Sequence, residues 1–135
     1  MAAHPWLDDS AAPLFQHNYP ADGTVDQVVE FGRIWEKTIR DYARPYGVVA
    51  DLTRLISAPA AVRKAMADTD TRMADVDQKY CVGSAIVVSS TFGRGLVTAV
   101  FWIAPPVYPY RLFASMDEGR AWVRERLGSA GGPTT

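Results

Sequence analysis

The spacing of hydrophobic and polar residues changes several times along the chain, and each change predicts a new element. In residues 14–19, the side chains of Leu14, Gln16 and Asn18 alternate with those of Phe15, His17 and Tyr19, and a period of two residues is typical of a strand. Residues 25–43 instead place apolar side chains mostly on one face of a helix and charged side chains largely on the other. Thr24 and Gln27 have the spacing of a capping box at the start of this helix, and Pro45 predicts its end.

Central parallel strands are predicted by two continuous apolar runs, at residues 46–52 and 81–90, because a strand covered on both faces needs no polar side. A last strand is predicted at residues 108–115. At the N-terminus, a short strand around residues 4–7 is expected to pair with the alternating strand across a turn at residues 8–10.

Hydroxyl side chains indicate where the remaining helices start. Ser57 is a candidate N-cap for a helix with Pro59 in its first turn. The acidic segment that follows, residues 68–77, predicts the exposed end of this helix and a loop. Ser90 or Thr91 is expected to cap an unusually apolar helix that two prolines close.

The last helix begins at a second capping box, Ser115 with Glu118, and Gly128 is expected at its C-terminal end. The resulting order is β-β-α-β-α-β-α-β-α. Strands that alternate with helices imply right-handed crossovers and a mixed, mainly parallel sheet, with the N-terminal hairpin as an antiparallel edge. The fold class is therefore α/β. We expect one domain over residues 1–128 and a flexible tail at residues 129–135.

Composition excludes several classes of protein. The chain has 135 residues, of which 48% are hydrophobic, and this suits a single domain with its own core. Its net charge of −1 gives no general attraction to nucleic acid, which we do not expect as a partner. The single cysteine, Cys81, excludes an internal disulfide framework and is expected to be a buried, inert thiol. No signal peptide is visible, and the longest apolar stretch, residues 96–106, is too short to cross a bilayer, so we expect a cytoplasmic location without membrane insertion.

The segment Gly93-Arg94-Gly95 follows a strand and a run of hydroxyl residues, which is how many proteins hold a phosphate. It lacks the third glycine of a dinucleotide fingerprint and the lysine of a P-loop. The main interpretation is therefore structural: Ser90 or Thr91 caps a helix, and the glycines allow close packing. The alternative is an anion held by the free N–H groups of the helix start, with Arg94 as the counter-charge.

Further polar residues are predicted at the same edge of the sheet. Ligands of open α/β sheets tend to bind at the carboxyl ends of parallel strands, and Asp51 ends one of the buried strands. The alternative for Asp51 is a structural role, in which it accepts backbone N–H bonds. The candidate binding or interaction edge consists of Asp51, Arg54, Ser57, Ser89, Ser90, Thr91 and Arg94.

Catalytic and metal sites find little support in the sequence. His4 and His17 are the only histidines, and no ligand spacing around them matches a metal site. The strand-end serines lack a nucleophile elbow, and no histidine follows them. We therefore expect no catalytic residues, no bound metal and no cofactor.

An aromatic segment at residues 101–113 is expected to lie mostly in the core. Tyrosine, tryptophan and arginine are also favoured at protein interfaces, and the prolines and tyrosines of its loop are expected to leave part of the segment exposed. Tyr108, Tyr110 and Arg111 are therefore a possible partner surface.

The order of elements resembles the STAS / SpoIIAA-like fold, and more narrowly the small bacterial STAS/SEC14-like proteins. The likeness is carried by the segment GSAIVVSSTFGRGLVTAVFWIAPPVYPYRLFASMDEGRAWVRERL and by YGVVADLTRL. In anti-sigma-factor antagonists of this fold, a serine of an Asp-Ser-Ser-Gly segment is phosphorylated. The corresponding segment here, DLTRLISAPAA, has Ser57 near that place but departs from the pattern. SEC14-like relatives bind lipids in an apolar pocket.

The resemblance implies a non-catalytic regulatory or protein-interaction module of the bacterial cytoplasm, with a protein partner and a possible homodimer. The alternative is a small-ligand domain that binds a lipid or an anionic metabolite near Arg94, with apolar walls from the helix at residues 96–103. These two functions differ in structure, because ligand binding requires a concave pocket at the strand ends into which Arg94 points.

Overall fold

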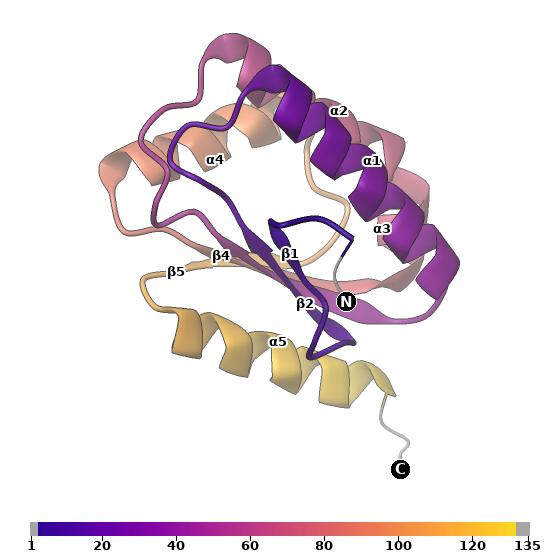
Figure 1. Cartoon of the computed structure of the whole chain (residues 1–135). Helices are drawn as coiled ribbons and strands as arrows, with labels where there is room; N and C mark the ends of the chain where they lie inside the picture. Colours follow the sequence, from indigo (N-terminus) through magenta and orange to yellow (C-terminus); the bar gives the residue numbers. More distant parts are fainter. Residues whose placement is uncertain (1–2, 132–135) are drawn as a thin grey trace.

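The computed structural model describes residues 3–131, which form a layered structure (Figure 1). A five-stranded sheet lies in the middle, helices α1 to α4 lie on one side of it, and α5 covers the other side. Along the chain the elements are β1 (Leu7–Asp8), β2 (Leu14–Asn18), α1 (Val25–Tyr42), β3 (Tyr46–Asp51), α2 (Ala60–Arg72), α3 (Ala74–Tyr80), β4 (Cys81–Val87), α4 (Thr91–Ile103), β5 (Tyr110–Phe113) and α5 (Met116–Gly131).

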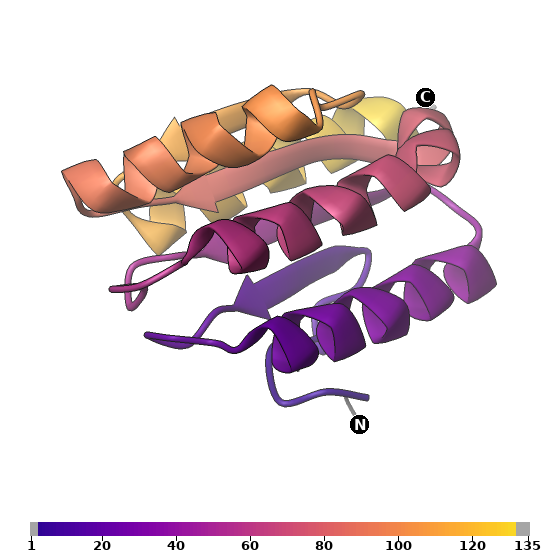
Figure 2. The ribbon, with the colours of Figure 1, turned by 90° about the horizontal axis from the view of Figure 1, so that it is seen from above.

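The strands lie in the sheet in the order in which they occur in the chain, β1-β2-β3-β4-β5. β1 runs antiparallel to β2, with Leu7 opposite His17, and each later pair of neighbours is parallel. Figure 2 shows α1, α2 and α4 side by side on one face, each of them connecting two neighbouring strands. The predicted mixed, mainly parallel sheet with an N-terminal hairpin is confirmed.

Helix α1 begins and ends where the sequence predicts. The backbone N–H of Gln27 donates to Thr24 Oγ1 at 3.2 Å, and the N–H of Thr24 donates to Gln27 Oε1 at 2.9 Å, which completes the capping box. The helix ends at Tyr42, and its C-cap residue, Ala43, has a φ of 48°, which lies in the left-handed region. Pro45 follows two residues later and disfavours continuation of the helix.

The region between β3 and β4 differs from the prediction in two ways. Ser57 is not an N-cap: α2 begins after Pro59 without a side-chain cap, and the N–H of Ser57 donates to the carbonyl of Ala21 at 3.1 Å. The acidic segment 68–77 is not a loop, since it completes α2 and forms most of α3. Aspartate favours loops when it is considered alone, but here the helical face that carries Met66 continues onto Asp70.

Helix α5 extends three residues beyond Gly128, to Gly131, so the expected tail at residues 129–135 overlaps its last turn. The remainder of that tail, residues 132–135, lies outside the described residues. Ser115 caps the helix by accepting a bond from the N–H of Glu118 at 3.2 Å. The Glu118 carboxylate accepts from the Ser115 hydroxyl at 3.1 Å, which differs from the reciprocal backbone bond of the predicted capping box.

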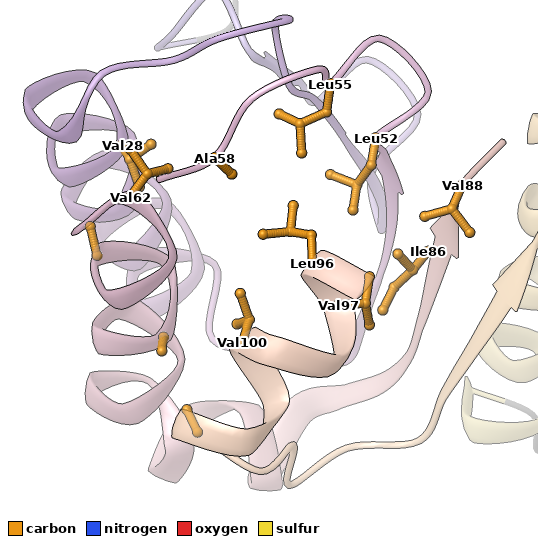
Figure 3. Packing of buried hydrophobic residues seen from close by; sticks show 13 residues of the cluster. Val28, Leu52, Leu55, Ala58, Val62, Ile86, Val88, Leu96, Val97 and Val100 are labelled. Carbon is orange, nitrogen blue, oxygen red and sulfur yellow. The ribbon is translucent and has the colours of Figure 1, made fainter. Parts of the chain in front are cut away.

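The two faces of the sheet are packed differently. Under α5, Leu14, Val49, Ala85 and Val87 surround Val123 in a small cluster. A Cβ atom added to Gly47 would lie 2.4 Å from Val123 Cγ1, so only glycine allows the helix to come so close. The opposite face carries a larger aliphatic cluster, to which α1, α2, α4 and the sheet all contribute (Figure 3).

Candidate binding cavity

A cavity of about 140 Å³ lies between the sheet and helices α1, α2 and α4. Its aliphatic walls come from all of these layers, and Figure 3 shows their side chains converging: Val28, Leu52, Ile86, Leu96, Val97 and Val100. Aromatic side chains of Phe31, Trp35 and Phe101 complete the apolar lining. The apolar wall that we expected from the helix at residues 96–103 is therefore present.

One end of this cavity is acidic. It is formed by Asp70 from α2, Asp77 from α3, Tyr46 and Cys81 at the first residues of β3 and β4, and Tyr108 from the loop before β5. We call this set the acidic end. Tyr46 and Cys81 are register partners, and the Tyr46 hydroxyl donates a hydrogen bond to Asp77 Oδ1. Because β3 and β4 begin here, the acidic end lies at the amino ends of the strands.

The two carboxyl groups titrate at higher pH than ordinary aspartates. Burial, with a smaller contribution from the charge of Asp77, raises the pKa of Asp70 to about 7. Burial also raises the pKa of Asp77 to about 6, although the hydrogen bond from Tyr46 and the charge of Arg40 act in the opposite direction. The Asp70 side chain is half-buried, and no hydrogen bond or ion pair of this side chain is found within residues 3–131. Its carboxyl oxygens are therefore available to a group that enters the cavity.

The hydroxyl and thiol groups of the acidic end keep their protons. Burial and the nearby carboxyl groups raise the pKa of Tyr108 well above its usual value, and burial raises the pKa of Tyr46. Burial, followed by the charge of Asp77, raises the pKa of Cys81 to about 12. The Cys81 side chain is therefore a thiol and not a thiolate at neutral pH, so it is a poor nucleophile. The residue is half-buried, whereas the sequence predicted a buried thiol.

His17 is the second unsatisfied polar side chain of the cavity wall. It lies on β2, only 6% exposed, with its ring 4.2 Å from that of Trp35. In the described part of the chain, its Nε2 atom has no hydrogen-bond partner. Burial lowers the pKa of His17 to about 3, so the imidazole is neutral.

The predicted binding or interaction edge lies at the carboxyl ends of the strands, away from the acidic end. Asp51 Oδ1 accepts bonds from the Thr53 N–H at 2.9 Å and the Thr53 hydroxyl at 2.7 Å, which is the structural role we considered. Ser90 caps α4 by accepting from the Gly93 N–H at 3.1 Å. The other five candidates are exposed, and none of the seven lines the cavity: Arg54, Ser57, Ser89, Thr91 and Arg94.

Arg94 does not point into the cavity, so the geometry that we required for anion binding near Arg94 is not met. In the described residues, its side chain also forms no ion pair. A role of this edge in binding a partner stays a prediction.

The aromatic segment is divided between the interior and the surface. Tyr108 belongs to the acidic end of the cavity, whereas Tyr110 and Arg111 are exposed. The ring of Tyr110 lies 4.8 Å from that of Phe101. Trp102, at the end of α4, is 84% exposed, although we expected most of this segment in the core.

Sequence reasoning did not select Asp70, Asp77 or His17 as site residues. One signal for Asp70 was present in the spacing, because Val62, Met66 and Asp70 recur every four residues along a helix that buries Val62 and partly buries Met66. His17 follows the alternation of β2, which places it on the same face as Phe15. Neither pattern distinguishes a residue that packs in the core from one that borders a cavity.

A similar arrangement of elements occurs in a solved structure. It is the crystal structure of an uncharacterized protein of the DUF3478 family from Shewanella loihica PV-4, which is described as having a SpoIIAA-like fold. The two chains superpose with a TM-score of 0.56, and the match covers 87% of this chain and 90% of that chain. This chain has a SpoIIAA-like fold.

The predicted resemblance to the STAS / SpoIIAA-like fold is thus confirmed. At 14% sequence identity the likeness concerns the SpoIIAA-like fold alone. No family model matches the chain, and no curated protein matches it. In the described part of this SpoIIAA-like structure, no helix is long and apolar enough to cross a membrane, and no group of three or more His, Cys, Asp or Glu side chains is placed to hold a metal ion.

Proposed function

We propose that this domain binds a small, mainly apolar molecule in the cavity between the sheet and helices α1, α2 and α4, and that it does not transform that molecule chemically. One observation carries the proposal: in a mainly apolar cavity, the buried Nε2 atom of His17 has no hydrogen-bond partner among the described residues, and the half-buried Asp70 side chain has none there either. Buried polar groups are normally hydrogen-bonded, so the unpartnered imidazole nitrogen in particular indicates a ligand site.

The volume of the cavity supports a small ligand. Protein interiors are close-packed, and an apolar cavity of about 150 Å³ accommodates benzene. The cavity here, at about 140 Å³, suits a molecule with one ring or a short chain rather than a complete lipid. The anionic metabolite that we considered is also disfavoured, because the carboxyl groups of Asp70 and Asp77 would repel it.

A non-catalytic role is supported by the chemistry of the cavity wall. Cys81 keeps its proton at neutral pH, and a His17 with a pKa of about 3 cannot accept a proton there. These are the two side chains of the lining that most often act as nucleophile and general base.

The test is the binding of toluene, followed by backbone amide NMR shifts. We expect the shifts to concentrate on residues that line the cavity, such as Ala50 and Val100. The variant Ala50→Leu places extra carbon atoms in the cavity and is expected to abolish the shifts. The control is Ala61→Leu, which makes the same substitution at an exposed position of α2. Equal shifts in both variants, or none in the unmodified protein, would contradict the proposal.

A second candidate function, a regulatory protein-interaction module, is supported by the surface at the end of α4. Trp102 and Ile103 are exposed there, and Val107 is exposed in the following loop. Tryptophan is enriched at protein–protein interfaces, and a group of exposed apolar side chains often marks such an interface. The test is an affinity pull-down from the native host with Trp102→Ser compared with Arg94→Glu. Loss of a partner with the first variant supports the α4 surface, loss with the second supports the strand-end edge, and no partner contradicts this function.

A further inference from the structure

The chemistry of the cavity specifies the ligand more closely, on the premise that the proposed small-molecule function is correct. We propose that the ligand is a primary amine with a compact apolar body, and that its ammonium group is held between the carboxyl groups of Asp70 and Asp77. The apolar body occupies the space below α4.

The first step is the charge of the lining. Two carboxyl groups line the cavity, and neither lysine nor arginine is among the residues around it. Arg40 acts on Asp77 from a distance, but its side chain is paired with Glu36 at 2.9 Å and with Asp75 at 3.0 Å. Within residues 3–131, no lysine or arginine therefore gives the acidic end a direct counter-charge.

The second step is the number of acceptor atoms that remain. Asp77 uses Oδ1 for the bond from Tyr46, and the half-buried Asp70 side chain has no hydrogen-bond partner within residues 3–131. Two carboxylates that approach from different helices suit an ammonium group, which has three donors and no acceptor. Hydrogen bonds between an ammonium donor and a carboxylate are among the strongest in proteins.

The third step is the surroundings of the charge. Aromatic side chains line the same cavity, including Phe31, Trp35 and Phe101. Aromatic faces attract cations and repel anions, so they favour an amine over a carboxylate of equal size. His17 gives an independent indication of a polar ligand, because its buried Nε2 atom on the same cavity wall lacks a partner in the described chain.

The experiment uses three probes that share one ring and differ in charge: benzylamine, benzyl alcohol and benzoate. Their affinities for the full chain are measured by calorimetry near neutral pH. We expect benzylamine to bind at least about tenfold more tightly than benzyl alcohol, as a charge-assisted bond predicts, and benzoate to bind most weakly. Asp70→Asn is expected to abolish the preference for benzylamine while the affinity for benzyl alcohol stays within about twofold.

A matched control lies two residues earlier on the same helix. Asp68 is paired with Lys64 at 3.0 Å on the solvent side, so Asp68→Asn removes the same charge from α2 without changing the cavity. The preference for benzylamine is expected to persist in this variant. Asp77→Asn provides a second variant from α3, in which the preference is expected to fall. Far-ultraviolet circular dichroism establishes that each variant is folded.

The possible failures are distinguishable. If benzyl alcohol or benzoate binds as tightly as benzylamine, or if Asp70→Asn keeps the preference, the amine proposal is overturned and the small-molecule function stands. If none of the three probes binds and toluene does not bind either, both proposals are overturned.

Discussion

Under α5, the sheet presents Leu14, Val49 and Val87, and a glycine at position 47 brings the helix into close contact. On the opposite face, the same strands present His17, Tyr46, Ala50 and Ser84 to a cavity. Side chains alternate between the faces along each strand, so neighbouring residues belong to different environments. Around Val123, the α5 face is closely packed. The other face is incompletely filled and carries all the polar groups for which we propose a function.

The largest expected effect comes from one substitution made on both faces. Leu14, under α5, and Leu96, in the cavity wall, are each 4% exposed. Leu14→Ala is expected to lower the free energy of unfolding by about 3 kcal/mol, because it creates a new void in a filled core. Leu96→Ala is expected to cost about 1 kcal/mol less, because part of its surface already faces empty space and fewer contacts are lost. Chemical denaturation measures both values, and an equal or greater loss for Leu96→Ala would contradict the difference between the faces.

A smaller effect is expected from the acid of the cavity. The pKa of Asp70 is about 7 in the folded protein and 3.8 ordinarily, so the folded state binds more protons between these values and stability falls as pH rises through them. His17, with a pKa of about 3 against an ordinary 6.5, acts in the opposite sense between those values. The two contributions therefore partly cancel between pH 4 and 6.5.

Asp70→Asn removes one of these opposing contributions. The stability of the variant relative to the unmodified protein is expected to increase by about 2 kcal/mol between pH 4 and pH 8, measured by denaturation at each pH. Asp68→Asn, on the solvent side of the same helix, is expected to show no such trend. A pH-independent difference for Asp70→Asn would mean that this carboxyl group is not buried in the cavity.

The smallest effect concerns α4, the helix that covers the cavity. Ser90 caps α4, whereas its neighbour Ser89 is exposed and has no described side-chain bond. Ser90→Ala is expected to lower the unfolding free energy by about 1 kcal/mol, and Ser89→Ala by less than about 0.5 kcal/mol. Thermal unfolding of the two variants compares them directly. Equal effects would show that the cap does not contribute to the stability of this face.

The sequence was sufficient for the fold because the strands of a buried parallel sheet are continuous apolar runs, as at residues 46–52, and because Thr24 and Ser90 carry clear capping signals. The cavity was not predictable in the same way. An apolar residue such as Val97 has the same pattern whether it contacts another side chain or borders a space. The aspartates of segment 68–77 suggested a loop, because aspartate is common in loops and its burial depends on tertiary contacts. Arg94 was predicted as a site residue because its charge lies near the carboxyl end of a strand. The charged groups of the cavity, Asp70 and Asp77, lie instead at the amino ends of the strands.

The alternation of side chains along β3 also bears on how this sequence can vary. A one-residue slip in the register of β3 would exchange its two faces, placing Tyr46 under α5 and Gly47 over the cavity. Substitution of only those residues of β3 that face the cavity, which are every second residue, would change the cavity and leave the contacts of α5 intact. Substitution at alternate strand positions would therefore alter the proposed ligand preference without disturbing α5, whereas a change in the length of a strand would disturb both faces.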